Sequence, residues 1–196
     1  MRKINKILKK VIIILDLIGL ILIINKKLDC TVLKWFLLSI SVIIPDVLSK
    51  LKVSIKTNIE LLYLILIFLS FTLGRIYNIY ETIKWYDTLV HFMSGKLTFI
   101  FGLIILKKMN KYDKKILFNV LFSIMMTITL AALWELTEFG IDKVLHKDMQ
   151  DVIKTGVDDT MKDILVAILS ALLVIITYIY ETKKKKKGLI TKLISE

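Results

Sequence analysis

Cysteine, proline and glycine are scarce in this sequence: its 196 residues include one Cys, one Pro and seven Gly. Because Cys30 has no second cysteine to pair with, a scaffold of intrachain disulfides is excluded. The scarcity of Pro and Gly also excludes a collagen-like repeat and is not typical of a disordered chain. Acidic residues are in deficit as well, since 17 Asp and Glu stand against 29 Lys and Arg and leave a net charge of +12.

Apolar side chains, in contrast, are abundant: 56% of the residues are hydrophobic and the mean hydropathy is +0.71. A water-soluble domain of this length cannot bury so many of them, so the sequence predicts an integral membrane protein. In a soluble chain the positive charge would suggest nucleic acid, but here the anionic surface of a membrane accounts for it. We therefore expect membrane lipids as partners and no nucleic acid.

Six apolar stretches approach the roughly 20 residues that a membrane-spanning helix requires. They are residues 7–24, 31–48, 59–77, 87–106, 116–139 and 160–180. The first resembles a signal peptide, but the segment Asn25-Lys26-Lys27 after it offers no small-x-small cleavage site, so a retained helix is expected. The second is the weakest, because Lys34 and Asp46 lie near its ends.

This pattern predicts an all-α polytopic membrane helix bundle with about six transmembrane helices. Residues 1–182 would form a single integral membrane domain, and residues 183–196 a basic cytoplasmic tail. Basic residues accumulate on the cytoplasmic side of membrane proteins. Most of the 29 Lys and Arg residues fall on one side if both termini are cytoplasmic, so we expect that orientation.

Acidic residues are concentrated in the second half of the chain, where eleven of the 17 lie between Glu81 and Asp163. In the expected orientation ten of these eleven lie at or just inside the outer face of the membrane: Glu81, Asp87, Glu135, Glu138, Asp142, Asp148, Asp151, Asp158, Asp159 and Asp163. Carboxylates near hydrocarbon are costly when ionised. They must be protonated, paired with a cation or bound to a metal.

Helical spacing places several of these acids on faces that also carry small residues. The three faces comprise Asp87, His91, Ser94, Gly95, Thr98 and Gly102; Ser123, Thr127, Ala131, Glu135, Glu138 and Asp142; and Asp159, Asp163, Ala167, Ser170 and Ala171. Small residues let membrane helices approach closely, and polar residues face the interior of a bundle. We expect the three faces to pack together and their polar ends to form an outward-facing pocket.

One histidine among several carboxylates could hold a divalent metal ion such as Zn, Mn or Mg. The candidate metal ligands are His91, Glu135, Asp163 and Asp159, and the candidate catalytic residues are Asp87 and Glu138. Asp87, one turn before His91, would orient the imidazole, as carboxylates do for metal-bound histidines. Glu138 would act as the base.

Structural roles remain open for the same residues. Asp159 and Asp163 lie where negative charge stabilises the N-terminus of a helix. Glu135 and Glu138 could instead pair with Lys96, which lies about two turns inside the membrane. Lys96 would then neutralise a carboxylate, or it would hold an anionic lipid head group.

A set of short motifs between residues 86 and 163 resembles a known family. The motifs are Tyr86-Asp87, His91-Phe92, Gly95, Trp134-Glu135, Glu138, Met149-Gln150, Asp159-Thr160 and Asp163. In their order and spacing the chain resembles the YjdF-like family of uncharacterised bacterial multi-pass membrane proteins. A fainter likeness links it to VanZ-like proteins, which combine an Asp…His-Phe helix with later acidic helices. The resemblance implies a multi-pass protein of the bacterial cell membrane with a shared polar site, and it implies no reaction.

Three functions remain open from the sequence. The protein would be a metal-dependent enzyme acting on a lipid or lipid-linked envelope substrate, a cation- or proton-coupled transporter, or a non-catalytic scaffold whose polar cluster holds helices together. Asp16 and Asp46 have no evident partner in the sequence. The oligomeric state is not predicted.

Overall fold

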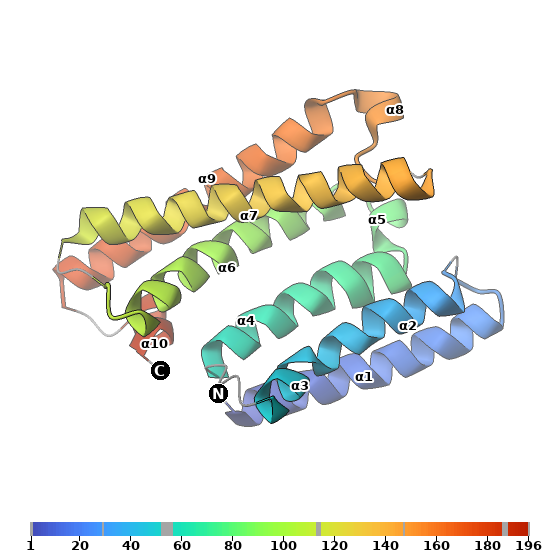
Figure 1. Ribbon diagram of the computed structural model, residues 1–196, viewed down its shortest axis with the longest axis horizontal. Helices are drawn as coiled ribbons and strands as arrows, with labels where there is room; N and C mark the ends of the chain where they lie inside the picture. Colours follow the sequence, from blue (N-terminus) through green and yellow to red (C-terminus); the bar gives the residue numbers. More distant parts are fainter. Residues whose placement is uncertain are drawn as a thin grey trace. The chain divides into compact units, whose positions relative to one another are not determined.

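The computed structural model describes residues 2–28, 30–51, 57–112, 115–146, 148–185 and 188–195. Over these ranges the chain is helical and contains no strand (Figure 1). The elements are α1 (Arg2–Ile24), α2 (Val32–Ile40), η1 (Ser41–Ile43), α3 (Ile44–Lys50), α4 (Thr57–Ile67), η2 (Phe68–Ile76), α5 (Ile79–Thr82), α6 (Tyr86–Lys108), α7 (Ile116–Leu145), α8 (Val152–Thr155), α9 (Asp158–Lys183) and α10 (Leu189–Ser195). The predicted all-α fold is confirmed.

The chain divides into two compact units, residues 1–90 and 91–195. The first unit contains α1 to α5 and the beginning of α6, and the second contains the rest of α6 and α7 to α10. The boundary follows Val90 and therefore lies inside α6, which is one continuous helix.

Five helical stretches in the described part of the chain are long and apolar enough to cross a membrane. They are Val32–Lys50, Thr57–Ile76, Tyr86–Lys108, Ile116–Val144 and Asp158–Lys183. They coincide with the second to sixth stretches predicted from the sequence. A multi-pass helical membrane protein is therefore confirmed.

Helix α1 forms over the first predicted span but is not among these five, because Lys9, Lys10 and Asp16 interrupt its apolar sequence. Two of these charges face protein. Lys9 Nζ lies 2.8 Å from Asp46 Oδ1 and 3.1 Å from Glu60 Oε1, and Asp16 is buried. The structure thus supports five spans by length and composition, while the sixth span and the cytoplasmic termini stay predictions.

The first unit is held together by an apolar cluster between α1, η1 and α4, formed by Ile12, Val42, Leu64 and Ile67. Hydrogen bonds to the backbone of α1 add to it: Trp35 Nε1 donates to the carbonyl of Asp16 at 2.7 Å. Near the start of α1, the Asn5 amide donates to Glu60 at 2.8 Å. Asp46, which had no evident partner in the sequence, therefore belongs to a polar cluster around Lys9.

In the second unit, the predicted small-residue faces do pack against one another. A Cβ atom added to Gly95 of α6 would lie 2.1 Å from the carbonyl oxygen of Ala167 in α9. A Cβ added to Gly102 would lie 2.9 Å from the Cα atom of Ser123 in α7. Glycine at these two positions allows the backbones to come this close, as small residues do in membrane bundles.

The other end of α7 and α9 carries a second buried polar contact. Tyr178 is fully buried, and its hydroxyl receives a hydrogen bond of 3.1 Å from Asn119 Nδ2. The same hydroxyl lies 2.7 Å from that of Tyr112, in the loop before α7. Burial is the main cause that raises the pKa of the Tyr112 phenol, and its bond to Tyr178 adds to the shift.

Part of the predicted basic tail is helical and folds back on α9. The Glu181 carboxylate accepts hydrogen bonds from the backbone nitrogen of Thr191 at 2.8 Å and from its hydroxyl at 2.9 Å. Ile190 and Ile194 of α10 are buried. Lys186 and Lys187 of the basic run lie outside the described residues.

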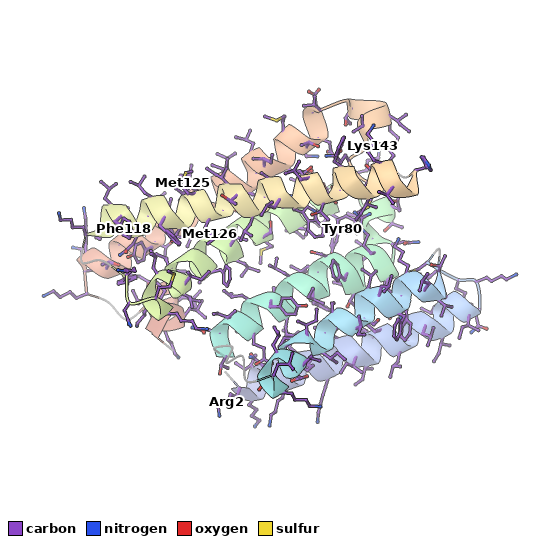
Figure 2. All side chains as sticks on the ribbon, viewed as in Figure 1. Arg2, Tyr80, Phe118, Met125, Met126 and Lys143 are labelled. Carbon is purple, nitrogen blue, oxygen red and sulfur yellow. The ribbon has the colours of Figure 1, made fainter. Side chains whose placement is uncertain are left out.

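Apolar side chains cover the outer surfaces of the helices. Figure 2 shows Phe118 and Met125 projecting from α7, and both side chains are exposed. Leu17 and Ile21 are likewise exposed on α1. An exposed apolar belt of this kind is stable only when lipid covers it.

The contact at Gly95 gives a stability prediction. Substitution Gly95→Ala should lower the free energy of unfolding by about 1–3 kcal/mol, because the new methyl group meets the backbone of α9. The matched control is Gly140→Ala, since a Cβ at Gly140 of α7 meets nothing within 4 Å. This control should gain about 0.5–1 kcal/mol from the better helix propensity of alanine. Thermal unfolding in detergent measures both variants, and equal melting temperatures would contradict the close packing.

Candidate metal centre

Helix α6 supplies two of the three candidate ligands, Asp87 in its first turn and His91 one turn later. The beginning of α6 is fixed by Tyr86, whose hydroxyl donates to the carbonyl of Leu69 at 2.9 Å. The Tyr86 ring also contacts Tyr80 edge to face, with centroids 5.3 Å apart. Burial raises the pKa of the Tyr80 phenol, so this side chain stays neutral.

Helix α9 supplies the third ligand, Asp163, which is 3% exposed. His91 is 6% exposed, and its Nε2 atom lies 3.8 Å from Asp163 Oδ2. The close contact of Gly95 with Ala167 explains this approach. His91 precedes Gly95 by one turn and Asp163 precedes Ala167 by one turn, so both side chains reach the same level.

Asp87, His91 and Asp163 form a group in which one ligand atom from each residue lies within 4.8 Å of the others. Two ligands bound to one zinc ion at about 2.1 Å are at most about 4.2 Å apart. Small side-chain rotations would therefore be enough to bring these atoms to ligating distance. Asp163 and His91 are buried while Asp87 is half-buried, so the group is accessible from the Asp87 side.

Asp87 thus lies with the candidate ligands, whereas the sequence analysis made it a candidate catalytic residue that orients His91. One imidazole nitrogen and two carboxylates are a ligand set typical of divalent transition metals. The signal was present in the sequence, because Asp87 and His91 are separated by four residues on one helical face.

Asp159, a further predicted ligand, lies outside this group. Its carboxylate forms an ion pair with Lys162 on the same helix. The Lys162 ammonium also lies 3.7 Å from Asp163 Oδ1, with its own side chain 45% exposed. Asp159 also lies in the first turn of α9, where negative charge is favourable, and its role as a metal ligand stays a prediction. Lys162 contributes positive charge at the edge of the site.

Glu135 and Glu138 of α7 are both buried, as the sequence analysis expected of side chains facing the bundle interior. Neither belongs to the group of three, among the residues described. The Glu138 carboxylate accepts a hydrogen bond of 3.1 Å from Trp134 Nε1, one turn earlier. The roles predicted for Glu135 as a ligand and Glu138 as a base stay predictions.

Gln150 connects the Glu135 turn of α7 to the start of α9. Its Nε2 atom donates to the carbonyl of Glu135 at 3.3 Å and to the hydroxyl of Thr160 at 3.1 Å. Thr160 precedes Asp163 by three residues, which is nearly one helical turn. The acidic ends of α7 and α9 therefore meet at one level, as predicted from the sequence.

The loop between α7 and α9 is held in place by Asp142. The Asp142 carboxylate accepts hydrogen bonds from the backbone nitrogens of Met149 at 2.7 Å and Gln150 at 3.1 Å. The sequence analysis placed Asp142 on the acidic face of α7 but did not find this contact. Its only signal was the Met149-Gln150 pair within the family resemblance.

The sequence analysis considered a carboxylate or an anionic lipid head group as the partner of Lys96, and the structure shows a different contact. Its ammonium lies over the ring of Phe92, 4.1 Å from the centroid. No ion pair between Lys96 and a carboxylate occurs among the described residues. A cation–π contact of this kind stabilises a lysine in an apolar segment.

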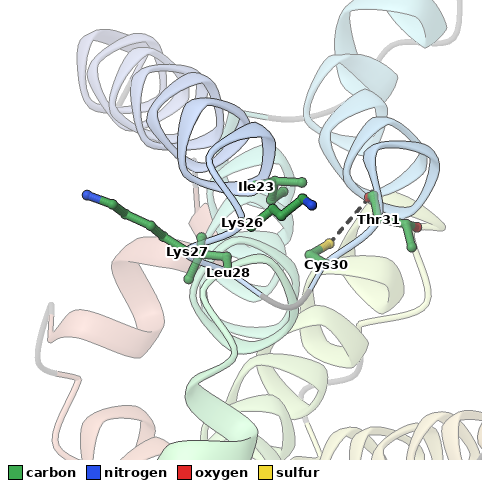
Figure 3. Close-up of a pocket in the computed structure, with 6 residues that line it drawn as sticks. All are labelled: Ile23, Lys26, Lys27, Leu28, Cys30 and Thr31. Atoms are coloured by element: carbon green, nitrogen blue, oxygen red, sulfur yellow. Dashed lines mark hydrogen bonds between the residues drawn. The ribbon is translucent and has the colours of Figure 1, made fainter.

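A separate pocket lies at the turn between α1 and α2, as Figure 3 shows. It is lined by Ile23, Lys26, Lys27, Leu28, Cys30 and Thr31. The Cys30 thiol donates to the carbonyl of Thr31 at 3.6 Å. Among the described lining residues there is no histidine or carboxylate, and the Cys30 sulfur is the one ligand atom typical of metal sites.

Helices that cross a membrane several times and carry a polar group between them define an integral membrane protein. Residues 7–184 match the family described as "Predicted membrane protein (DUF2238)", and the chain belongs to this family. It is also 34% identical over 100 residues to an uncharacterized protein of Thermotoga maritima. That match covers 50% of this chain and 50% of the relative, so the similarity spans half the length of each. No solved structure matches the chain. The resemblance to YjdF-like and VanZ-like proteins stays an expectation.

Proposed function

We propose that this membrane protein binds a divalent metal ion through Asp87, His91 and Asp163. The proposal rests on the approach of three ligand atoms from α6 and α9 to within 4.8 Å of one another. Two carboxylates beside one imidazole would carry an excess of negative charge if both were ionised. The Lys162 ammonium lies 3.7 Å from Asp163 and is partly exposed, and a divalent ion would add positive charge at the centre of the group.

A nitrogen ligand together with oxygen ligands favours Zn or Mn over Mg, which prefers oxygen alone. Three protein ligands are also the number that catalytic metal sites use, because a fourth position is kept for water or substrate. Asp87 is the most accessible of the three residues, so substrate would enter on its side.

The chemistry that fits these residues is hydrolysis of an ester or phosphoester bond in a lipid or lipid-linked substrate. A divalent ion held by Asp87, His91 and Asp163 would supply Lewis-acid chemistry, which activates water and polarises the bond to be cleaved. His91 and Asp163 would hold the centre rigid, since both are buried between packed helices. Glu138 would accept the proton of the attacking water and return it to the departing alkoxide, so that the lipid alcohol leaves.

Metal binding is tested on the purified protein in detergent, with Zn²⁺ and Mn²⁺ as probes. We expect about one tightly bound ion per chain, and at least about tenfold weaker binding in His91→Ala and Asp163→Asn, because each removes a ligand. The matched control is Asp159→Asn, which lies one turn before Asp163 and pairs with Lys162. It should bind the ion as the wild type does. Unchanged affinity in both ligand variants, with folding intact, would overturn the metal site.

The lipid reaction is tested in vesicles of phosphatidylethanolamine and phosphatidylglycerol loaded with the protein and Mn²⁺. Mass spectrometry should detect cleaved lipid in the wild type, and Glu138→Gln should slow its formation by at least about 100-fold while binding metal normally. Intact lipid in the presence of a metal-loaded protein would refute hydrolysis of these lipids and leave metal binding standing.

A second candidate function, proton or cation transport, is favoured by the buried polar side chains that continue along α7. Ser123 and Thr127 are fully buried, and Asn119 is buried beside Tyr178 at the far end. From Asn119 to Glu138 the helix rises about 28 Å, close to the roughly 30 Å of hydrocarbon in a bilayer.

Transport is tested by proton uptake into proteoliposomes under an imposed potential. If α7 lines a pathway, Thr127→Val should slow uptake severalfold, because it removes a buried hydroxyl. The control Thr137→Val removes an exposed hydroxyl that bonds only the carbonyl of Leu133 on its own helix, and it should change nothing. Uptake no faster than in protein-free vesicles would refute this second candidate.

A further inference from the structure

Asp16 is a buried carboxyl group in the first unit, remote in sequence from the candidate metal centre. It lies in the middle of α1 and is 3% exposed, whereas its chain neighbour Leu17 is exposed on the apolar outer face. Three elements, α1, α2 and η2, pack against one another around it. An ionisable group in this position within a membrane helix is a candidate functional site.

Two hydroxyl groups face the Asp16 carboxyl from the neighbouring helices. Thr72 Oγ1 of η2 donates a hydrogen bond of 2.9 Å to Asp16 Oδ1, and Ser39 of α2 lies close enough to interact with the same carboxyl. Ser39 Oγ is buried and has no hydrogen-bond partner among the described residues. Thr72 belongs to a π-helical segment, a rare geometry that often marks functional positions.

Two described cations on the elements that surround Asp16 have other partners. Lys9, the preceding cation on the inner face of α1, is bound to Asp46 and Glu60. Fully buried Ile12 lies between Lys9 and Asp16 along that face. On η2, the Arg75 guanidinium lies 4.5 Å from the centre of the Tyr80 ring.

Two further donors near Asp16 reach the backbone rather than the carboxyl group. The Tyr77 hydroxyl, the other titratable group facing this region, donates to the carbonyl of Leu15 at 2.8 Å. Trp35 Nε1 donates to the carbonyl of Asp16. No ion pair with Asp16 occurs within the part of the chain that the structure describes. An ionised carboxylate buried in this way, without a cation, is strongly unfavourable.

We propose that Asp16 is a proton-binding site, with its carboxyl group protonated at neutral pH between Thr72 and Ser39. Thr72 then donates to the carbonyl oxygen of the acid, as its 2.9 Å bond to Oδ1 requires. The acidic O–H donates to Ser39 Oγ, which supplies this buried hydroxyl with a partner. A single proton thus neutralises the buried Asp16 carboxylate and gives the Ser39 hydroxyl a hydrogen-bond partner.

Infrared spectroscopy of the protein in lipid nanodiscs at neutral pH tests this directly, through the C=O stretching band of a protonated carboxyl. The wild-type minus Asp16→Asn difference spectrum should show this band, because asparagine keeps the shape of the neutral acid and loses its absorption. Other buried acids contribute equally to both samples and cancel. The matched control is Asp46→Asn, whose carboxylate is 54% exposed and paired with Lys9; its difference spectrum should lack the band.

Ser39→Ala provides a second reading on a protein that keeps Asp16. Losing the hydrogen bond to Ser39 should shift the same band to higher frequency, so the test does not depend on folding of the asparagine variant. Absence of the band in the wild type at neutral pH would overturn the proposal. Its disappearance when sodium chloride replaces choline chloride would also overturn it, since a metal cation rather than a proton would then occupy the site.

Discussion

The close approach of α6 and α9 at Gly95 is the constraint on which the candidate metal centre depends. A side chain at this position would overlap the carbonyl of Ala167, so only glycine permits the separation that the structure shows. One turn away, His91 and Asp163 come within 3.8 Å because their helices are held so close. The geometry of the polar group therefore depends on helix packing in the apolar part of the bundle.

Most of the fold, and part of the site, could be predicted from the sequence because both depend on helical periodicity. Apolar runs gave the positions of the helices, and four-residue spacing placed Asp87 beside His91 on α6. What the spacing could not give was which faces meet at what distance. Asp87, His91 and Asp163 form one group and Glu135 lies outside it. Which side chains meet in this way depends on how each helix is rotated about its axis. The backbone contacts of Gln150 depend on a loop that no periodicity describes.

Hydropathy describes α1 poorly for a related physical reason. A hydropathy average treats Lys9 and Asp16 as if their charges faced lipid. In the structure both side chains are directed at neighbouring helices. Lys9 is neutralised by two carboxylates from α3 and α4, and Asp16 is surrounded by hydroxyls. The same rule governs the second unit, where Glu135, Glu138 and Asp163 are buried. In both units polar chemistry lies inside the bundle and leaves the outer surface apolar.

The loop between α7 and α9 shows how unevenly substitutions would be tolerated in this protein. Asp142 receives backbone N–H groups, so the identity of the side chain at Met149 is irrelevant to that clamp. Position 150 is different, because an amide nitrogen must donate to both Glu135 and Thr160. Glutamate there would match glutamine in size yet present an acceptor to a carbonyl oxygen. In relatives that share this loop, the clamp therefore leaves the residue type at position 149 free to vary, whereas position 150 should remain glutamine.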